Sequence, residues 1–151
     1  MPGFIKDNTA RQPFGKNEYR RSTRDLKYES YTCARASVPT ETIDGEAGLR
    51  VLQSGEVIAK ITSGGDSGKV GPFQAGVADG RQTTGNIVGV NDTFLPWQFN
   101  EAIDREIAVC YEGALVQAWC FERDAAGARI ALTNTTRDAM VALATLALMF
   151  K

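Results

Sequence analysis

The sequence predicts a mainly β protein with a small barrel- or sandwich-like body, an extended N-terminal arm and one C-terminal helix. From about residue 31, short apolar or alternating runs are separated by turns containing Gly and Asp, which is typical of small barrels and sandwiches. The first thirty residues show no sustained period of 2 or 3.6, whereas the last apolar run is long enough for a helix. We therefore assign residues 1–35 to the arm and residues 36–151 to the body.

The composition excludes several classes of function. The chain has 151 residues, enough for one domain, and its 17 Lys and Arg nearly balance its 18 Asp and Glu. A general binder of nucleic acid or membrane surfaces needs a basic surplus, so we expect neither partner. The sequence contains no His, and its three Cys and its acidic residues show no metal-ligand spacing. We expect no enzymatic activity, no cofactor and no metal.

The near-neutral charge is the sum of two unequal parts. Residues 1–30 carry a net charge of +3, and the rest of the chain carries −4. In the first part, single apolar or aromatic residues are spaced among polar ones: Phe4, Ile5, Phe14, Tyr19, Leu26 and Tyr28. Such a segment cannot bury enough surface to fold alone. It is either a solvated tail or an arm that orders on a partner and uses its aromatic residues as anchors.

The first part of the body contains five expected strands. In the third of them, Val57, Ala59 and Ile61 alternate onto one face. The Gly-rich residues 63–68 form a loop, which makes the flanking strands antiparallel partners, and Asp79-Gly80 marks another turn. The expected strands are residues 31–38, 49–52, 56–62, 69–73 and 85–90.

The second part of the body is expected to contain a hairpin and one short strand. Residues 106–111 and 114–121 flank Glu112-Gly113, a typical turn pair, and residues 129–132 form the short strand. The acidic residues just before the hairpin, such as Asp104, lie in a polar connector where carboxylates are usually solvated.

An aromatic cluster of Phe94, Trp97 and Phe99 lies in a stretch with loop signals and includes Pro96. Its side chains either pack onto the body or form an exposed contact patch, because large aromatic residues are enriched at interface hot spots.

The last segment differs from the rest of the body. Thr135 is the expected N-cap residue, and Asp138 lies three residues later, where a carboxylate favours the helix dipole. Residues 139–150 then contain Thr145 as their only polar residue, so a helix here must be covered on every side. Either the monomer buries this helix centrally, or a neighbouring subunit covers its outer face. The side chains that we expect at such an oligomer contact are Met140, Leu143, Leu146 and Phe150.

Residues 49–90 resemble the lambda-type head decoration proteins of tailed phages, which are also called capsid cement or stabilisation proteins. The resemblance rests on Val51-Leu-Gln-Ser-Gly-Glu-Val-Ile-Ala-Lys-Ile-Thr62, a Gly-rich loop, Gly71-Pro-Phe73, Ala78-Asp-Gly-Arg-Gln-Thr83 and Gly85-Asn-Ile-Val-Gly-Val90. Residues 108–116 also resemble the strand–turn–strand that follows in that family. In all, the resemblance covers about residues 45–122.

The resemblance implies a β-tulip-type body that assembles as a homotrimer on the outer surface of the virion capsid. It would occupy local three-fold positions of the expanded shell and stabilise the shell against the pressure of packaged DNA. The resemblance also implies that the arm orders on the major capsid protein, often by adding a strand to it. The anchors would be Phe4, Ile5, Phe14 and Tyr19, with Arg20, Arg21 and Arg24 as charged steering contacts.

Two further expectations follow from this hypothesis. Deletion of residues 1–30 should abolish or severely weaken capsid binding while the body stays folded. The alternative function is a β domain that binds a glycan or receptor through the patch of Phe94, Trp97 and Phe99.

Overall fold

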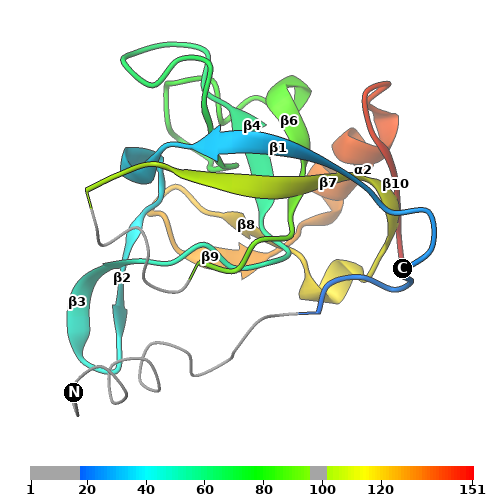
Figure 1. Ribbon diagram of the computed structural model, residues 1–151, viewed down its shortest axis with the longest axis horizontal. Coiled ribbons are helices and arrows are strands. Elements are labelled where there is room, and N and C mark those ends of the chain that lie inside the picture. The colour runs from blue at the N-terminus through cyan, green and yellow to red at the C-terminus, as the bar shows by residue number, and fades with distance from the viewer. Residues whose placement is uncertain (1–17, 96–101) are drawn as a thin grey trace.

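The computed structural model describes residues 18–95 and 102–151 of the chain, and these residues form a mainly β body with one short α-helix near the C-terminus (Figure 1). Short 3-10 turns at Arg35–Ser37, Thr84–Asn86 and Gln117–Trp119 join some of the strands. The elements are β1 (Lys27–Cys33), β2 (Thr40–Ile43), β3 (Glu46–Arg50), β4 (Val57–Lys60), β5 (Val70–Pro72), β6 (Ile87–Asn91), β7 (Arg105–Leu115), β8 (Phe121–Arg123), β9 (Arg129–Ala131), α2 (Asn134–Ala142) and β10 (Ala147–Phe150).

Five strands close into a small barrel. The main sheet has the order β1-β5-β4-β6-β7-β10, and β1 also pairs with β7, which returns the sheet to its first strand. The β1–β7 pairing is antiparallel and extends along all of β1. The β1–β5 pairing is a single parallel pair, Cys33 with Val70, supported by a 2.9 Å hydrogen bond from the Ala34 N–H to the Val70 carbonyl. The predicted fold class is therefore confirmed.

Most strands in the first part of the body agree with the sequence pattern. β4 and β5 form the predicted antiparallel pair around the Gly-rich loop, and β6 pairs with the other edge of β4. Both faces of β4 are buried: Val57 and Ala59 pack in one core cluster, and Ile58 packs in a second. β9 also lies where a short strand was predicted and pairs with β8.

The predicted hairpin around Glu112-Gly113 is wrong. β7 passes through both residues as one strand of eleven residues, with Gly113 at φ 152°. The first part of β7 pairs with β1 and β6, and its C-terminal part pairs with β10, so the strand has hydrogen-bonding partners along its whole length. The turn signal is overridden because continued pairing satisfies the main chain of these residues.

The predicted C-terminal helix is present, but it ends at Ala142, so the prediction is wrong for residues 143–150. α2 begins earlier, with Thr133 as its N-cap, and its C-cap is Leu143. The following residues form β10, which lies parallel to β7. The proposed oligomer-contact residues therefore do not share one helix face. Met140 and Leu146 are buried in the chain's own core, and Leu143 and Phe150 are partly buried against it.

The predicted arm boundary at residue 35 lies too far along the chain. Residues 27–33 are a barrel strand rather than part of an arm, and the main chain of Arg20 bridges to Leu115 on β7. Strand β1 also ends at Cys33, before the end of the strand that was predicted over residues 31–38. The described part of the body therefore begins at residue 18. In the part of the chain that the structure describes, no helix is both long and apolar enough to span a bilayer.

Candidate functional site

Tyr19, predicted to be an anchor for a partner, is part of the chain's own core. Its side chain is fully buried with Leu115, Cys110 and Met140, and its hydroxyl donates a 2.9 Å hydrogen bond to Asp92. Burial, followed by the negative charge of Asp92, raises the pKa of the Tyr19 phenol far above its ordinary value. The prediction for Tyr19 is wrong because its contacts with Cys110 and Leu115 of β7 have no signal in the polar sequence around it.

The three predicted steering arginines occupy different environments. Arg20 pairs with nearby Glu18 at 2.7 Å, and its side chain is partly buried. The side chains of Arg21 and Arg24 form no ion pair with any residue in the ranges 18–95 and 102–151. The other arm candidates, Phe4, Ile5 and Phe14, lie outside the described residues.

The predicted aromatic patch is described only in part. Phe94 is half-buried, directly before Leu95, whose main chain bridges to Leu52. Trp97 and Phe99 lie outside the described residues. The described residue of this patch is therefore partly packed against the body.

A groove crosses the outer face of the sheet where β7 and β10 pair. Its floor consists of Gly113 and Ala114 from β7 with Ala147 and Met149 from β10, which are neighbours in the parallel register. One wall is the segment 22–25, which precedes β1, and the opposite wall includes Val141 of α2. The hollow measures about 570 Å³, and a smaller one of about 220 Å³ adjoins it across Met149. We call the two hollows together the β7–β10 groove.

The groove exposes apolar side chains that the rest of the fold does not cover. Met149 is 64% exposed and Val141 is 55% exposed, which makes them the two most exposed large hydrophobic residues of the described chain. Ala147 is also exposed. Because Met149, Val141 and Ala147 line the same hollow, we take the groove as the candidate contact surface of the described chain.

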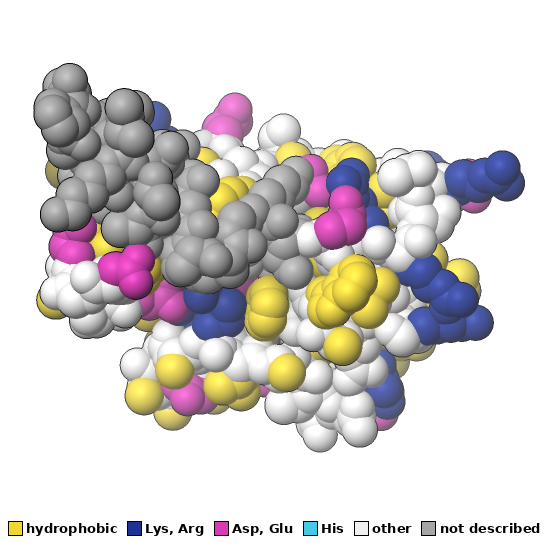
Figure 2. Space-filling view, turned by 90° about the horizontal axis from the view of Figure 1, so that it is seen from below, with side chains coloured by type: hydrophobic (Ala, Val, Ile, Leu, Met, Phe, Trp, Pro, Cys, Tyr) yellow, Lys and Arg dark blue, Asp and Glu magenta, His cyan; other side chains and the backbone are white. Residues whose placement is uncertain are grey.

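The rim of the groove carries a surplus of positive charge. Arg24 and Asp25 line the larger hollow, and Arg21 and Lys151 line the smaller one. Glu112 also lines the groove, but Lys27 pairs with it at 2.8 Å. Figure 2 shows Lys and Arg side chains gathered at the end of the molecule where β10 and the C-terminus lie, on the right of both views.

The main chain holds two of these cations in place. The Arg21 N–H donates to the Ala114 carbonyl at 2.9 Å, and the Lys151 N–H donates to the Leu115 carbonyl at 3.1 Å. Both side chains are thus presented from backbone fixed to β7, while their charged groups form no ion pair within the described chain. A partner that binds here would lose little entropy from ordering the backbone.

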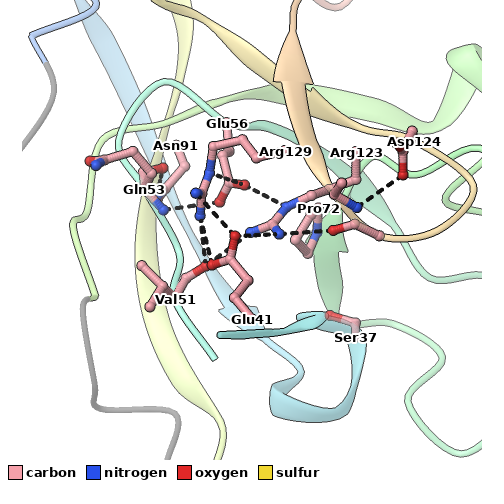
Figure 3. Close-up of polar contacts among 12 residues, drawn as sticks. Ser37, Glu41, Val51, Gln53, Glu56, Pro72, Asn91, Arg123, Asp124 and Arg129 are labelled. Atoms are coloured by element: carbon pink, nitrogen blue, oxygen red, sulfur yellow. Dashed lines mark hydrogen bonds and ion pairs between the residues drawn. The ribbon is translucent and has the colours of Figure 1, made fainter. Parts of the chain in front are cut away.

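A second charged cluster lies inside the body rather than on its surface (Figure 3). Glu56 and Arg123 are fully buried, and Arg123 Nε lies 2.7 Å from Glu56 Oε1. Arg129 Nε approaches the same oxygen at 3.1 Å, and Glu41 pairs with both arginines at 3.1–3.3 Å. The cluster joins β2 and the residue before β4 to the β8–β9 pair, which lies more than sixty residues further along the chain.

The protonation of this cluster follows from its contacts. Burial alone would raise the pKa of the Glu56 carboxyl, but the charges of Arg123 and Arg129 and the Gln53 N–H outweigh burial and lower it. Arg123 also donates to the carbonyls of Val51 and Gly127 at 3.0 Å. Because its charges are paired and its two central side chains, Glu56 and Arg123, are fully buried, we interpret the cluster as a structural element.

Asp104, one of the carboxylates in the polar connector, has a structural role. It accepts hydrogen bonds from Lys69 at 2.6 Å and from the Arg35 N–H at 2.9 Å. The hydrogen bond from Lys69 lowers the pKa of Asp104. The expectation that this carboxylate is simply solvated is therefore incomplete, because it joins the β4–β5 loop to the start of β7.

The three cysteine side chains are buried in the core. All three cysteines are free and buried, and burial raises the pKa of Cys33 and Cys120 to about 12 and that of Cys110 to about 11. Among the described residues, no group of three or more Cys, Asp and Glu side chains is arranged to hold a metal ion.

Sequence reasoning missed the residues of the groove. The sequence pattern places Val141 and Met149 in one continuous helix. In the structure they are exposed on two different elements, α2 and β10. Glu56 had a readable signal, because it directly precedes the buried strand residue Val57, whereas Arg123 lies between Glu122 and Asp124 and has none. In comparisons with known proteins, no family model, curated protein or solved structure matches this chain.

Proposed function

We propose that this protein is a capsid decoration protein of a tailed phage, which binds the outer surface of the expanded shell as a homotrimer at local three-fold positions. The observation that carries the proposal is the ordered pattern of residues 49–90. Within the described fold, the parts of this pattern coincide with successive strands of the barrel, β4, β5 and β6, and with the turns that join them. The function is mechanical, namely to hold neighbouring capsid subunits together against internal DNA pressure.

The body has the properties that such a role requires. The barrel is closed, and the buried Glu56–Arg123 cluster connects its strands to the β2–β3 and β8–β9 pairs. A rigid body transmits load between the contacts at its surface. Three copies per trimer provide avidity, so that each contact can be weak by itself.

The N-terminal residues 1–17 supply the second part of the mechanism. They include Phe4, Ile5 and Phe14, which we assign as anchors on the major capsid protein. An extended segment gains affinity from main-chain pairing and specificity from pockets for its side chains. Arg21 and Arg24 lie at the base of this segment and attract acidic groups of the shell.

Co-sedimentation with capsids tests the proposal. Expanded and unexpanded shells, assembled from the major capsid protein encoded in the same genome, are mixed with the full chain and with a variant lacking residues 1–17. We expect the full chain to bind expanded shells selectively and to raise the temperature at which they open. The truncated variant should bind at least about tenfold more weakly, because it loses anchors while keeping the folded body.

Two results would contradict the proposal. Absence of binding to expanded shells would exclude the function itself. Equal binding by the truncated variant would exclude the N-terminal mechanism but leave decoration by the body. Circular dichroism of both proteins controls for folding.

A glycan-binding β domain is the second candidate function, and one cleft favours it. The cleft measures about 550 Å³ and is lined by Glu29, Tyr31, Lys60, Asn86 and Tyr111, among others. Tyrosine rings with nearby amide, ammonium and carboxylate groups are suited to sugar hydroxyls and ring faces. A glycan array probed with the full chain and with Tyr111→Ala tests this function, and an array without a signal would exclude it.

A further inference from the structure

We propose that the β7–β10 groove is a docking site for an extended acidic segment of the major capsid protein. This inference rests on the proposed function, and it identifies a contact made by the folded body rather than by residues 1–17. The contact has two parts: an apolar floor for one or two side chains of the segment, and a cationic rim for its carboxylates.

The floor selects an apolar side chain. Met149 stands between the two hollows and is 64% exposed, and Val141 borders the larger hollow with 55% of its surface exposed. Covering this surface removes apolar area from water, and the flexible thioether of Met149 can adjust to the shape of the incoming group.

The rim selects negative charge. Glu112 already pairs with Lys27, so the remaining charged side chains that line the two hollows are three cations, Arg21, Arg24 and Lys151, and one carboxylate, Asp25. Within residues 18–95 and 102–151 these three cations form no ion pair. A carboxylate bound between them would gain charge-assisted hydrogen bonds without breaking an ion pair among the described residues.

Charge also decides between the possible occupants. Residues 1–17 carry three Lys or Arg against one Asp, so the chain's own N-terminal segment has the same sign of charge as the rim. An acidic segment of the shell has the opposite sign. The elongated form of two adjoining hollows, aligned with two parallel strands, fits a chain in extended conformation.

Binding of expanded capsids by surface variants tests the inference. The groove variants are Met149→Asp and the double change Arg21→Glu with Arg24→Glu. The matched control is Lys60→Glu, an exposed cation on β4 that forms no ion pair with described residues and lines a different cleft. We expect about tenfold or weaker binding for each groove variant and a change of less than about twofold for the control.

Photo-crosslinking identifies the occupant. p-Benzoylphenylalanine is placed at position 149 of the full-length chain, bound to expanded capsids and irradiated, and the linked peptide is sequenced by mass spectrometry. We expect a capsid-protein peptide rich in Asp and Glu. A link to residues 1–17 or to the body of a second copy would overturn the inference.

The outcomes separate the two proposals. If the unmodified chain does not bind expanded capsids, the proposed function fails and the inference fails with it. If the unmodified chain binds and the folded groove variants bind equally well, only the inference fails. Thermal unfolding of every variant shows whether it is folded.

Discussion

At the scale of single residues, Glu56 and Arg123 form the most consequential contact of the body. Both side chains are fully buried, and Glu56 Oε1 accepts from two arginines. Removal of one partner leaves the others charged in a medium of low dielectric constant, which costs about 3–5 kcal/mol. We expect Glu56→Gln to lower the free energy of unfolding by that amount, measured by urea titration. Glu106→Gln, an exposed carboxylate on β7, should change it by less than about 0.5 kcal/mol.

The same residue predicts a dependence of stability on pH. The arginines lower the pKa of Glu56 in the folded state, so its contribution is complete above the ordinary glutamate pKa of about 4.3 and is lost as the pH falls. The difference in unfolding free energy between the unmodified chain and Glu56→Gln should therefore stay constant above about pH 5 and narrow as the pH falls below about 4.3. Parallel stability curves over this range would show that Glu56 titrates normally.

The residues differ in how far the sequence could predict them. Val57, Ala59, Cys110 and Cys120 are buried as their apolar surroundings indicate. Tyr19 could not be placed, because its burial depends on β7, almost a hundred residues further along the chain. The cationic rim of the groove could not be predicted from the sequence either. Arg21 and Lys151 come close together only because both ends of the described chain bind to β7.

At the scale of elements, α2 begins two residues earlier than the sequence pattern predicts, with Thr133 rather than Thr135 as its N-cap residue. The Thr133 hydroxyl accepts from the Thr136 N–H and donates to Glu122, whereas Thr135, the predicted cap, is exposed within the first turn. Loss of an N-cap costs about 1 kcal/mol. We expect Thr133→Ala to lower the free energy of unfolding by about 1 kcal/mol or more and Thr135→Ala to leave it nearly unchanged. Equal effects of the two substitutions would place the cap elsewhere.

The contact between β6 and β7 depends on a glycine. Gly89 has φ 143°, and a Cβ there would overlap the Cys110 carbonyl, a backbone atom that cannot move without shifting β7. We expect Gly89→Ala to lower the free energy of unfolding by about 2 kcal/mol or more. Gly85→Ala is the matched control, because a Cβ at that position meets nothing within 4 Å. If Gly85→Ala lowered the thermal midpoint and Gly89→Ala did not, the proposed overlap with the Cys110 carbonyl would be wrong.

The elements that the sequence could not predict share one physical cause. Glu112-Gly113 and the apolar run after residue 138 have clear local signals, for a turn and for a helix. Both signals lose to the pairing of β7 with β10, which satisfies main-chain groups and buries Leu148. Strands β4, β5 and β6 were predictable because each pairs with a strand close to it in sequence.

At the scale of the whole molecule, the division of charge into a positive first part and a negative remainder does not mark the boundary of the fold. The described residues before position 30 carry Arg21, Arg24 and Lys27, yet they belong to the body and form one wall of the groove. The cationic character of the first thirty residues is thus shared between residues 1–17 and the surface next to β10. Both parts serve the proposed attachment to an acidic partner.

Because residues 18–30 belong to the body, the end point of an N-terminal truncation determines whether the remaining chain folds. Removal of residues 1–17 leaves Tyr19 and all of β1 in place, so the variant should unfold cooperatively near the midpoint of the full chain. Removal of residues 1–30 deletes Tyr19 and more than half of β1, the strand that closes the barrel against β7. Loss of the Tyr19 side chain alone costs about 3–5 kcal/mol, a large part of the stability of a typical domain.

We therefore expect the shorter deletion to abolish strong capsid binding in a folded protein and the longer one to abolish folding itself. Calorimetry of the two variants checks the result, with Arg20→Ala in the full chain as a control for the loss of charge. A cooperative transition in the chain that lacks residues 1–30 would show that the barrel closes without β1. The boundary between arm and body would then return to residue 35, as the sequence alone predicts.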